Sequence, residues 1–489
     1  MPIMTLMVSL RAHWMVCVAA IAASFSACGQ SLVSRLDAVL AEKSIASEQM
    51  SVVVARLGTA GTASSEILYQ RNGKSPLIPA SNLKVVTSSA ALAELGREFK
   101  FRTVLALRDA GTGVHDVVLV GDGDPTLGDP EFSSENASNP VWLLDRWAGE
   151  LAARGVKSVR HVIVDDSVFD EDFIHSGWPA DQLNLDYVAQ ISGMSWQFNC
   201  VKIVVSPSRA VRTVPETRYV AITNQVKAGK SNSIWATRPQ GSNQLTVMGS
   251  MTGSGSAASA TIPIHDPGGY TATLLSEALA RHGVTVTGIV GKNRQMRQML
   301  EKAPSAFTVV GIHETPIAAV LPRVNKDSAN LYAEALIKRL GHAKTGQPGS
   351  WANGRAAVIS YLQGLGLESS QFVIDDGCGL SRGNRISGEL LVRVLAADFA
   401  GPNRDVFLSS LSVGGRDGTL RKRFSGDLAG RVYGKTGYIN QVSTMSGIVA
   451  GKNGQWFAFA ALFNDLKGGT AAARQAQEKI VAAIDATSR

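Results

Sequence analysis

Cysteine is scarce in this sequence, with four residues in a chain of 489. Cys17 and Cys28 fall in or beside the amino-terminal segment, which leaves Cys200 and Cys378 for the rest of the chain. These two are far apart and lack the spacing of a metal site. They form either a single disulfide or two buried free thiols, and we favour the thiols. No metal or other cofactor is expected.

Histidine is also scarce, and none of the eight histidines follows His342. The segment Gly379-Leu-Ser-Arg-Gly383 has the spacing of a hydrolase nucleophile elbow, but that chemistry needs a histidine later in the chain. His313-Glu314 could open a zinc-protease motif, but Pro316 would break the helix and Ile317 stands where the second histidine belongs. Both of these hydrolase classes are therefore excluded.

Long apolar runs are missing after residue 30, so no later segment is expected to span a bilayer. The apolar run Trp14–Ala23 follows Arg11 and His13 and is too short for a membrane span. It predicts an export signal over residues 1–27, with cleavage near Ala27. A degenerate lipobox ending at Cys28 leaves lipidation of that residue as an open alternative. We expect an exported protein of the periplasm or cell envelope.

Basic residues outnumber acidic ones by 48 to 40, which gives a formal charge of +8. The basic residues are scattered, and no basic run is interleaved with aromatic residues, so no nucleic-acid partner is expected. On an exported protein a positive surface favours an anionic envelope polymer.

The pattern of elements predicts two or three domains of an α/β (α+β) protein. Residues 32–103 and 295–489 are expected to form one unit, an antiparallel sheet flanked by helices. Residues 104–294 consist of short β runs broken by Gly, Asp and Pro, which predicts a β-rich insertion. A nested part at about 206–262 is the candidate for a further domain.

The segment Pro79–Leu92 predicts a helix with Ser81 and Lys84 on its first turn. Residues three apart on a helix share a face, so the Ser81 hydroxyl and the Lys84 amine can come within hydrogen-bond reach. Ser81 is therefore a candidate nucleophile with Lys84 as its base. A lysine acts as a base only if burial or a second cation keeps it partly neutral. The alternative is a capped structural helix with a solvated lysine.

Two later segments of the sequence contain the further residues that an active site around Ser81 and Lys84 needs. Ser328-Ala-Asn330 stands at the entry of a predicted helix that has an internal Glu334–Lys338 pair and stops at Gly341. Lys435-Thr436-Gly437-Tyr438 lies against a probable strand.

Ser-x-x-Lys, Ser-x-Asn and Lys-Thr-Gly, in this order, are the motif set of serine β-lactamases and penicillin-binding proteins. The chain resembles the low-molecular-mass class C penicillin-binding proteins, the D-alanyl-D-alanine carboxypeptidase/endopeptidase family. The likeness extends to Gly121–Leu127, Asp165–Asp170 and Asp376–Asn384, and to the long insertion. Two residues depart from the family pattern, which often has Asp in place of Ala329 and usually Ser in place of Cys378.

The resemblance implies a β-lactamase/transpeptidase-like catalytic domain and a Ser81 acyl-enzyme formed with Lys84 as base. It implies that Ser328 relays a proton to the leaving amine and that Asn330 orients the substrate or Lys84. Lys435 would depress the Lys84 pKa and, with Thr436, bind the substrate carboxylate. The N–H groups of Ser81 and Tyr438 are the expected oxyanion hole. Gly437 completes this substrate-binding strand.

The resemblance also implies a pocket for the zwitterionic end of a diaminopimelate side chain, with Asp181 as its anion, Arg382 as its cation and Tyr187 as a wall. The alternative is that Asp181 caps a turn and Arg382 makes a structural ion pair. The expected substrates are peptidoglycan stem peptides, with β-lactam antibiotics as inhibitors. A serine β-lactamase and a non-catalytic envelope lipoprotein are the competing functions, and the large insertion favours the peptidase.

Overall fold

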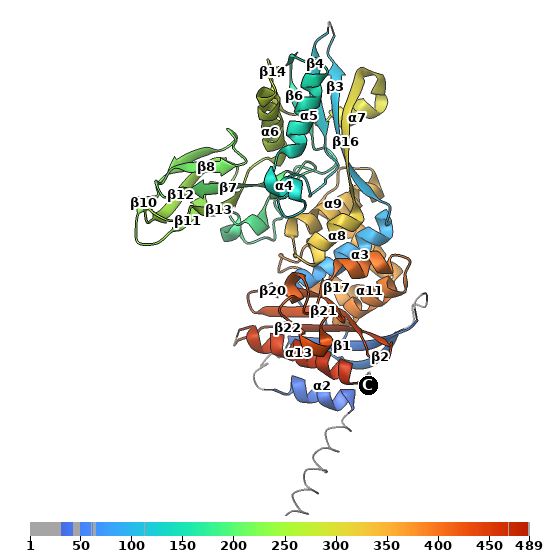
Figure 1. The fold of residues 1–489 in the computed structure, drawn as a ribbon. Coiled ribbons are helices and arrows are strands. Elements are labelled where there is room, and N and C mark those ends of the chain that lie inside the picture. The colour runs from blue at the N-terminus through green and yellow to red at the C-terminus, as the bar shows by residue number, and fades with distance from the viewer. Residues whose placement is uncertain are drawn as a thin grey trace, which may run out of the picture.

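The computed structural model describes residues 31–487 apart from 43–48, 60, 62–64, 112 and 468. The predicted export signal and Cys28 lie outside the described residues. Within the described part of the chain, the helices are all too short or too polar to cross a membrane. Helices and strands alternate through the chain, and the predicted α/β (α+β) class is confirmed (Figure 1).

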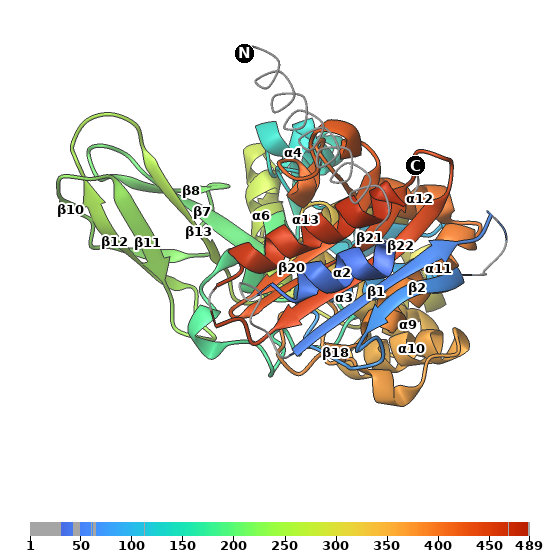
Figure 2. The same cartoon turned by 90° about the horizontal axis from the view of Figure 1, so that it is seen from below.

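Both ends of the chain build one six-stranded antiparallel sheet, in the order β19-β20-β21-β22-β1-β2. Its strands are β1 (Gln49–Leu57), β2 (Ser65–Arg71), β19 (Ser412–Val413), β20 (Val432–Ile439), β21 (Val442–Ala450) and β22 (Trp456–Asn464). Strand β1 pairs along its whole length with β22, which joins residues more than 390 positions apart. Figure 2 looks onto one face of this sheet, with α2 and α13 in front of the strands.

Helices cover both faces of this sheet (Figure 2). Val52 and Val54 of β1 pack in the core with α2 and α13, whereas Val53 and Ala55 pack on the opposite side. The outer helices are α2 (Leu32–Leu40) and α13 (Ala471–Ala486), and the inner ones are α3 (Leu83–Leu95), α8 (Ile317–Asn325), α9 (Asn330–Thr345), α10 (Trp351–Gly364), α11 (Gly388–Ala400) and α12 (Arg404–Ser410). Because both faces are buried, β1 and β22 read as nearly continuous apolar runs.

A second, five-stranded sheet forms the body of the insertion, in the order β15-β6-β4-β3-β16. Its strands are β3 (Lys100–Asp109), β4 (His115–Val120), β6 (Val162–Asp165), β15 (Val290–Lys292) and β16 (Phe307–Pro316). Helices α5 (Trp142–Ala153) and α6 (Pro267–Arg281) cover one face, and α7 (Met296–Lys302) covers the other. This sheet extends from Lys100 to Pro316, so it reaches past both limits of the predicted insertion, 104 and 294.

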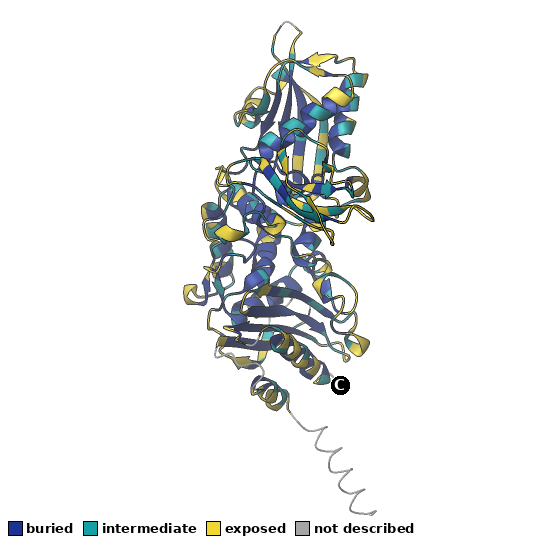
Figure 3. Ribbon diagram, turned by 90° about the vertical axis from the view of Figure 1, so that its left-hand side faces the viewer, coloured by how far each residue is buried: buried dark blue, intermediate teal, exposed yellow. Residues whose placement is uncertain are grey.

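A small β unit projects from the side of the insertion (Figure 1). One three-stranded sheet contains β7 (Cys200–Val205), β8 (Val211–Val214) and β13 (Ala258–Pro263). A four-stranded sheet contains β9 (Ala221–Asn224), β10 (Lys227–Ala228), β11 (Ser233–Thr237) and β12 (Gln244–Met251). The short pairs β5 (Ser158–Val159) with β14 (Thr285–Val286) and β17 (Phe372–Val373) with β18 (Arg385–Ile386) and the helix α4 (Ser134–Ser138) complete the described strands and α-helices. In Figure 3 the strands of this side unit carry many more exposed residues than the six-stranded sheet.

Two local predictions on α9 are wrong. The helix continues past Gly341 to Thr345 and ends at Gly346, whose φ of 68° is a left-handed cap that glycine adopts without strain. Glu334 and Lys338, predicted to pair with each other, have different partners, because both are buried and each faces another segment.

Candidate active site

Ser81 lies on a short 3₁₀ turn, η2 (Ala80–Asn82), directly before α3 rather than on the first turn of α3. The buried side chain of Asn82 fixes this turn to β21. Its Nδ2 donates to Thr444 Oγ1 at 2.7 Å, and its Oδ1 accepts from Ser446 Oγ at 2.6 Å. The preceding Ala80 has a φ of 47°, an uncommon value for a residue with a Cβ. The turn that presents Ser81 is thus held by the sheet.

Two glycines let separate segments approach this turn closely. A Cβ on Gly437 of β20 would overlap Thr444 Oγ1 and lie 2.7 Å from the Pro79 carbonyl oxygen. A Cβ on Gly379 would overlap the Ala80 carbonyl oxygen, and Gly379 also has a φ of 85°. Glycine at these two positions therefore allows β20 and the loop 375–384 to pack against the Ser81 turn.

Lys84 is the buried centre of the site and donates to three neutral acceptors. Its Nζ lies 2.9 Å from Ser81 Oγ and 2.7 Å from Asn330 Oδ1. The third acceptor is the Cys378 carbonyl oxygen, at 2.8 Å. Ser81, Lys84 and Asn330, predicted from two separate motifs, are brought into one hydrogen-bonded group.

Burial lowers the pKa of the Lys84 ammonium, and the nearby acidic groups, including Asp376 and Glu334, oppose this shift only in part. The resemblance implied that the charge of Lys435 depresses this pKa, but burial is what lowers it. Burial also holds the pKa of Lys435 well below its usual range, and the charge of Lys84 lowers it further. A lowered amine pKa is what a lysine needs in order to accept a proton near neutral pH.

Lys435 and Ser328 form the second half of the site. The buried Lys435 Nζ donates to Ser328 Oγ at 3.0 Å and to the Thr436 carbonyl at 2.7 Å. Ser328 has a φ of 62°, a left-handed value that turns the chain just before α9 begins. The three motifs thus come together in one site. They lie on the η2 turn with α3, at the entry of α9 and on β20.

Ser81 and Ser328 open into a cavity of about 380 Å³ along the part of β20 that lies beyond its short pairing with β19. Thr436, Gly437 and Tyr438 line it as well, and Thr436 Oγ1 donates to Thr419 Oγ1 at 2.9 Å. Every residue predicted for the catalytic or carboxylate-binding part therefore lies in the cavity or directly behind it.

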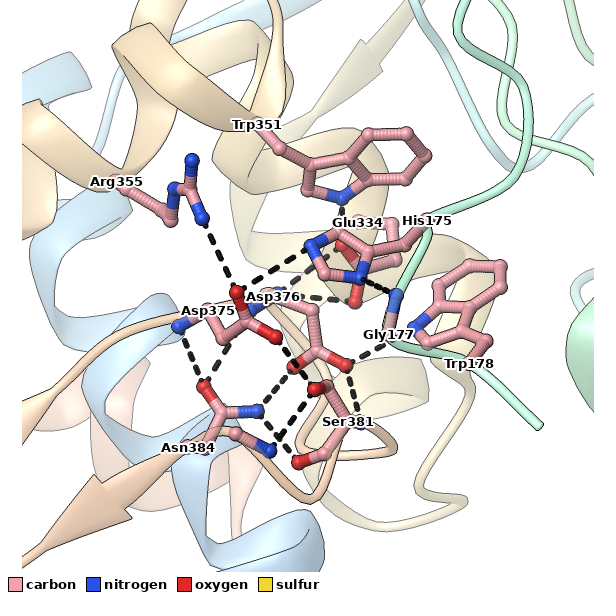
Figure 4. A network of polar contacts seen from close by, with 12 residues as sticks. His175, Gly177, Trp178, Glu334, Trp351, Arg355, Asp375, Asp376, Ser381 and Asn384 are labelled. Carbon is pink, nitrogen blue, oxygen red and sulfur yellow. Dashed lines mark hydrogen bonds and ion pairs between the residues drawn. The ribbon is translucent and has the colours of Figure 1, made fainter.

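The network around Glu334 was not predicted from the sequence (Figure 4). Glu334 is fully buried on α9, one turn after Asn330, and accepts from the N–H groups of Gly377 and Cys378 and from Trp351 Nε1, at 2.6 to 3.1 Å. These bonds fix the backbone on the amino side of Cys378, whose carbonyl oxygen accepts from Lys84. Burial, together with the charge of Asp376, raises the pKa of Glu334 to about 7. Glutamate four residues after an Asn is too common in helices to be recognised as functional in a sequence.

Asp376 fixes the rest of the 375–384 loop (Figure 4). It accepts from Trp178 Nε1 at 3.0 Å, from the N–H groups of Gly379 and Ser381 at 2.7 Å, and from Asn384 Nδ2 at 2.8 Å. Glu334, Asp376 and Cys378 also lie close enough together to be considered as metal ligands, but N–H donors already occupy the carboxylate oxygens. Cys200 and Cys378 are both buried free thiols, as favoured from the sequence.

Asp181, Arg382 and Tyr187 lie at the rim of the site. Arg382 is exposed and donates to the Asn440 carbonyl, in the turn between β20 and β21, at 3.0 Å. Asp181 is exposed. Burial raises the pKa of Tyr187, and the negative charge of Asp181 raises it further. The Tyr187 carbonyl accepts from Asn330 Nδ2 at 2.9 Å. Tyr187 therefore lies near Asp181 and is hydrogen-bonded to Asn330 of the catalytic group. That Asp181 and Arg382 bind the two ends of one ligand stays a prediction.

Comparison with known proteins supports the fold and identifies the family. Residues 32–487 match the model of the D-Ala-D-Ala carboxypeptidase 3 (S13) family. The chain is 33% identical over 462 residues to the D-alanyl-D-alanine carboxypeptidase of an Actinomadura species, an alignment that covers 88% of this chain and 81% of the relative. It is 24% identical to the D-alanyl-D-alanine carboxypeptidase DacB of Haemophilus influenzae, with 82% and 83% covered.

The fold is also that of a solved structure. The crystal structure of penicillin binding protein 4 from Haemophilus influenzae superimposes with a TM-score of 0.74 at 21% identity, covering 92% of this chain and 99% of the other. A second structure of that protein is a complex with a β-lactam and gives a TM-score of 0.69. These similarities include the catalytic sheet and the insertion together.

Proposed function

The chain belongs to the D-Ala-D-Ala carboxypeptidase 3 (S13) family, and from this premise we propose that it is a serine DD-peptidase acting through a Ser81 acyl-enzyme. Its substrates are peptidoglycan stem peptides, cleaved at the terminal D-Ala-D-Ala bond or at D-Ala-diaminopimelate cross-links. The observation that carries the proposal is the buried Lys84 amine, 2.9 Å from Ser81 Oγ and lowered in pKa.

In the acylation step Ser81 Oγ attacks the carbonyl carbon of the penultimate D-alanine while Lys84 takes the hydroxyl proton. The C–O bond to Ser81 forms and the C–N bond to the leaving amino acid breaks. Water then hydrolyses the ester and regenerates Ser81. Asn330, which accepts from Lys84, keeps the amine pointed at the nucleophile.

The leaving amine needs a proton, and we assign its delivery to Ser328, because Lys435 Nζ lies 3.0 Å from Ser328 Oγ. Lys435 and Thr436 bind the carboxylate of the leaving group. The N–H groups of Ser81 and Tyr438 stabilise the oxyanion, a contribution of roughly 3 to 4 kcal/mol for a single donor in comparable sites. Gly437 makes this possible by letting β20 approach the Ser81 turn.

Labelled penicillin tests the nucleophile. The wild type is expected to be labelled covalently and stoichiometrically, and Ser81→Ala is expected to lose the label while keeping its fold. Normal labelling of Ser81→Ala would sink the assignment. Ser381→Ala is the matched control, because that serine lies in the neighbouring loop and donates to Asp375 rather than to Lys84.

Turnover separates the peptidase from the competing functions. A DD-peptidase releases D-alanine from a pentapeptide and is held by penicillin as a slowly hydrolysed acyl-enzyme. Fast steady-state hydrolysis of penicillin without release of D-alanine would identify a β-lactamase instead. Binding without covalent labelling or release of D-alanine would identify a non-catalytic protein.

We further propose that the protein works in the cell envelope, where these peptides are found. The support is the apolar run Trp14–Ala23, which follows basic residues and precedes small ones. Amino-terminal sequencing of the mature protein tests cleavage near Ala27, and mass spectrometry tests a lipid on Cys28.

A further inference from the structure

The cavity at Ser81 continues beyond the residues assigned to catalysis. Past Thr436 its walls are formed by Thr419, Arg423, Ser443, Arg474 and Gln477, so it extends toward the first turns of α13. Among the described residues that line it, the charged ones are the two arginines. This end of the cavity is therefore positively charged.

Arg423 is held rigidly in this wall. Its Nε donates to Glu478 Oε1 at 2.7 Å, and its Nη2 donates to Gln477 Oε1 at 3.3 Å and to the Arg474 carbonyl at 3.1 Å. Burial lowers the pKa of Arg423, its ion pair with Glu478 opposes this shift, and the charge of Arg474 adds a smaller lowering effect. Glu478 is already the ion-pair partner of Arg423, whereas no carboxylate of the described residues pairs with Arg474, so Arg474 is the guanidinium that is open to a carboxylate in the cavity.

Arg474 lies at the exposed end of the same wall. Its guanidinium carbon is 5.8 Å from the ring of Tyr438, a side chain that is itself exposed at the edge of β20. Tyr438 follows Gly437 directly, so Arg474 lies beside the strand assigned to the leaving-group carboxylate. Guanidinium groups bind carboxylates in a directed, bidentate manner.

The size of the cavity also exceeds what a single D-alanine needs. About 380 Å³ falls in the range of pockets that hold small-molecule ligands. The leaving group of a cross-link is larger than D-alanine and has several carboxylates. One is on the diaminopimelate centre next to the cleaved amide, another is the α-carboxylate of the γ-linked D-glutamate, and a third ends the acceptor peptide.

We propose that Arg423 and Arg474 form a carboxylate subsite for the acceptor peptide of a cross-link, beyond the carboxylate bound by Lys435 and Thr436. The inference rests on the proposed function and adds to it the residues that recognise the acceptor peptide of a cross-link. The subsite attracts and orients the acceptor peptide, while the bond cleaved and the acyl-enzyme stay the same.

Peptide hydrolysis by the wild type and Arg474→Gln tests the subsite. The substrates are a monomeric pentapeptide, a cross-linked tetrapeptide dimer and the same dimer with the acceptor's terminal carboxylate amidated. Loss of one charge-assisted contact is expected to lower the ratio of kcat/KM for the dimer to kcat/KM for the pentapeptide about 10- to 100-fold. Arg421→Gln is the control, because this exposed arginine of the same segment lies outside the cavity wall, and its ratio is expected to equal that of the wild type.

The amidated dimer identifies the group that is recognised. It is expected to be a poorer substrate than the free dimer for the wild type, and equal to it for Arg474→Gln, because the contact is already lost. An unchanged ratio in Arg474→Gln, or a variant that still discriminates against the amidated dimer as the wild type does, overturns the subsite.

Wild-type activity separates this inference from the proposed function. Release of D-alanine without cleavage of the dimer overturns the subsite and leaves the DD-peptidase intact. If the wild type acts on neither peptide, the proposed function falls and the subsite with it. Penicillin labelling of Arg474→Gln verifies that the variant is folded.

Discussion

Buried cations occur in two regions of this molecule, and their partners differ. At the junction of the insertion and the catalytic unit, Lys338 Nζ donates to Asp170 Oδ1 at 2.6 Å, and Arg323 pairs with Asp129, Glu131 and Asp327 at 2.7 to 3.0 Å. At the active site, the buried Lys84 donates to a hydroxyl, an amide oxygen and a carbonyl. The junction satisfies its cations with carboxylates, whereas the two buried lysines of the active site, Lys84 and Lys435, donate to neutral oxygens.

The charge of the hydrogen-bond acceptors distinguishes a structural lysine from a catalytic one better than the direction of its pKa shift does. Burial lowers the pKa of Lys338 as well as that of Lys84, so a lowered pKa by itself does not identify the base. Lys338 has a carboxylate within 2.6 Å and also lies 3.8 Å from the centre of the Trp351 ring, which favours its charged form. Lys84 has no such carboxylate among its hydrogen-bond acceptors in the described structure, and its neutral form is accordingly easier to reach.

Replacing each lysine by methionine tests this comparison most strongly. Lys84→Met is expected to slow penicillin acylation about 10³-fold, because the base is lost, while the free energy of unfolding stays equal to or above that of the wild type. Lys338→Met is expected to acylate at nearly the wild-type rate but to lose about 1 to 3 kcal/mol of stability, because Asp170 loses its partner. Stopped-flow acylation and urea unfolding measure the two effects. The comparison fails if Lys84→Met is the less stable variant or Lys338→Met the slower one.

Glu334→Gln tests how the neutral acceptors of Lys84 are held in place. Glutamine has an N–H₂ group where Glu334 accepts from backbone N–H groups, so the Cys378 carbonyl is expected to shift and acylation to slow roughly 10- to 100-fold. Removing this negative charge also lowers the Lys84 pKa, so the rising limb of the pH–rate profile is expected to move to lower pH. Acylation rates measured across the pH range check both effects.

Asp398→Asn is the control for the Glu334 variant. Asp398 is also a buried acid, with a pKa raised by burial to about 7, but it accepts from Ser89 and does not contact the 375–384 loop. Its replacement should leave the pH–rate profile in place. If both variants shift the profile equally, Glu334 acts through general electrostatics or stability rather than by positioning Lys84.

Asp181 and Arg382 are exposed, so their alanine variants test the rim of the active-site cavity rather than its interior. Each alanine variant is expected to lose about 1 to 3 kcal/mol in kcat/KM for peptides with the free diaminopimelate end. Penicillin acylation is expected to stay nearly unchanged, because a β-lactam has no such end. If penicillin and peptide slow equally, these two residues support the fold and the specificity pocket lies elsewhere.

The buried carboxyl group of Asp398 makes the free energy of unfolding depend on pH. This is the prediction with the smallest expected effect on activity. Because the folded-state pKa is raised from 3.8 to about 7, Asp398 favours folding below about pH 4, and this contribution is lost as the pH rises through 7. Relative to Asp398→Asn, the wild type is expected to lose on the order of 2 to 4 kcal/mol of unfolding free energy between pH 4 and pH 9. Urea unfolding of both proteins at several pH values measures this, and a constant difference would contradict it.

The sequence by itself determined the catalytic motifs and the fold class. Ser81 and Lys84 are three residues apart, so local helical geometry alone is enough to pair them. Ser328, Asn330 and Lys435 were found because the motif set has a fixed order and chemistry, and the pattern of helical and strand segments predicted an antiparallel sheet flanked by helices. In these cases the information lies within one short segment or one repeated pattern.

The tertiary structure alone decided the contacts made between distant segments. Glu334 reaches Gly377 and Cys378 only because α9 packs beside the 375–384 loop, and Arg474 joins Arg423 at the cavity wall only because α13 packs on the sheet. The limits of the insertion sheet likewise depend on the pairing of β3 with β16, two strands separated by nearly 200 residues. A single sequence has no local signal for such pairs, because the hydrophobic pattern of each segment states that it is buried but not which segment covers it.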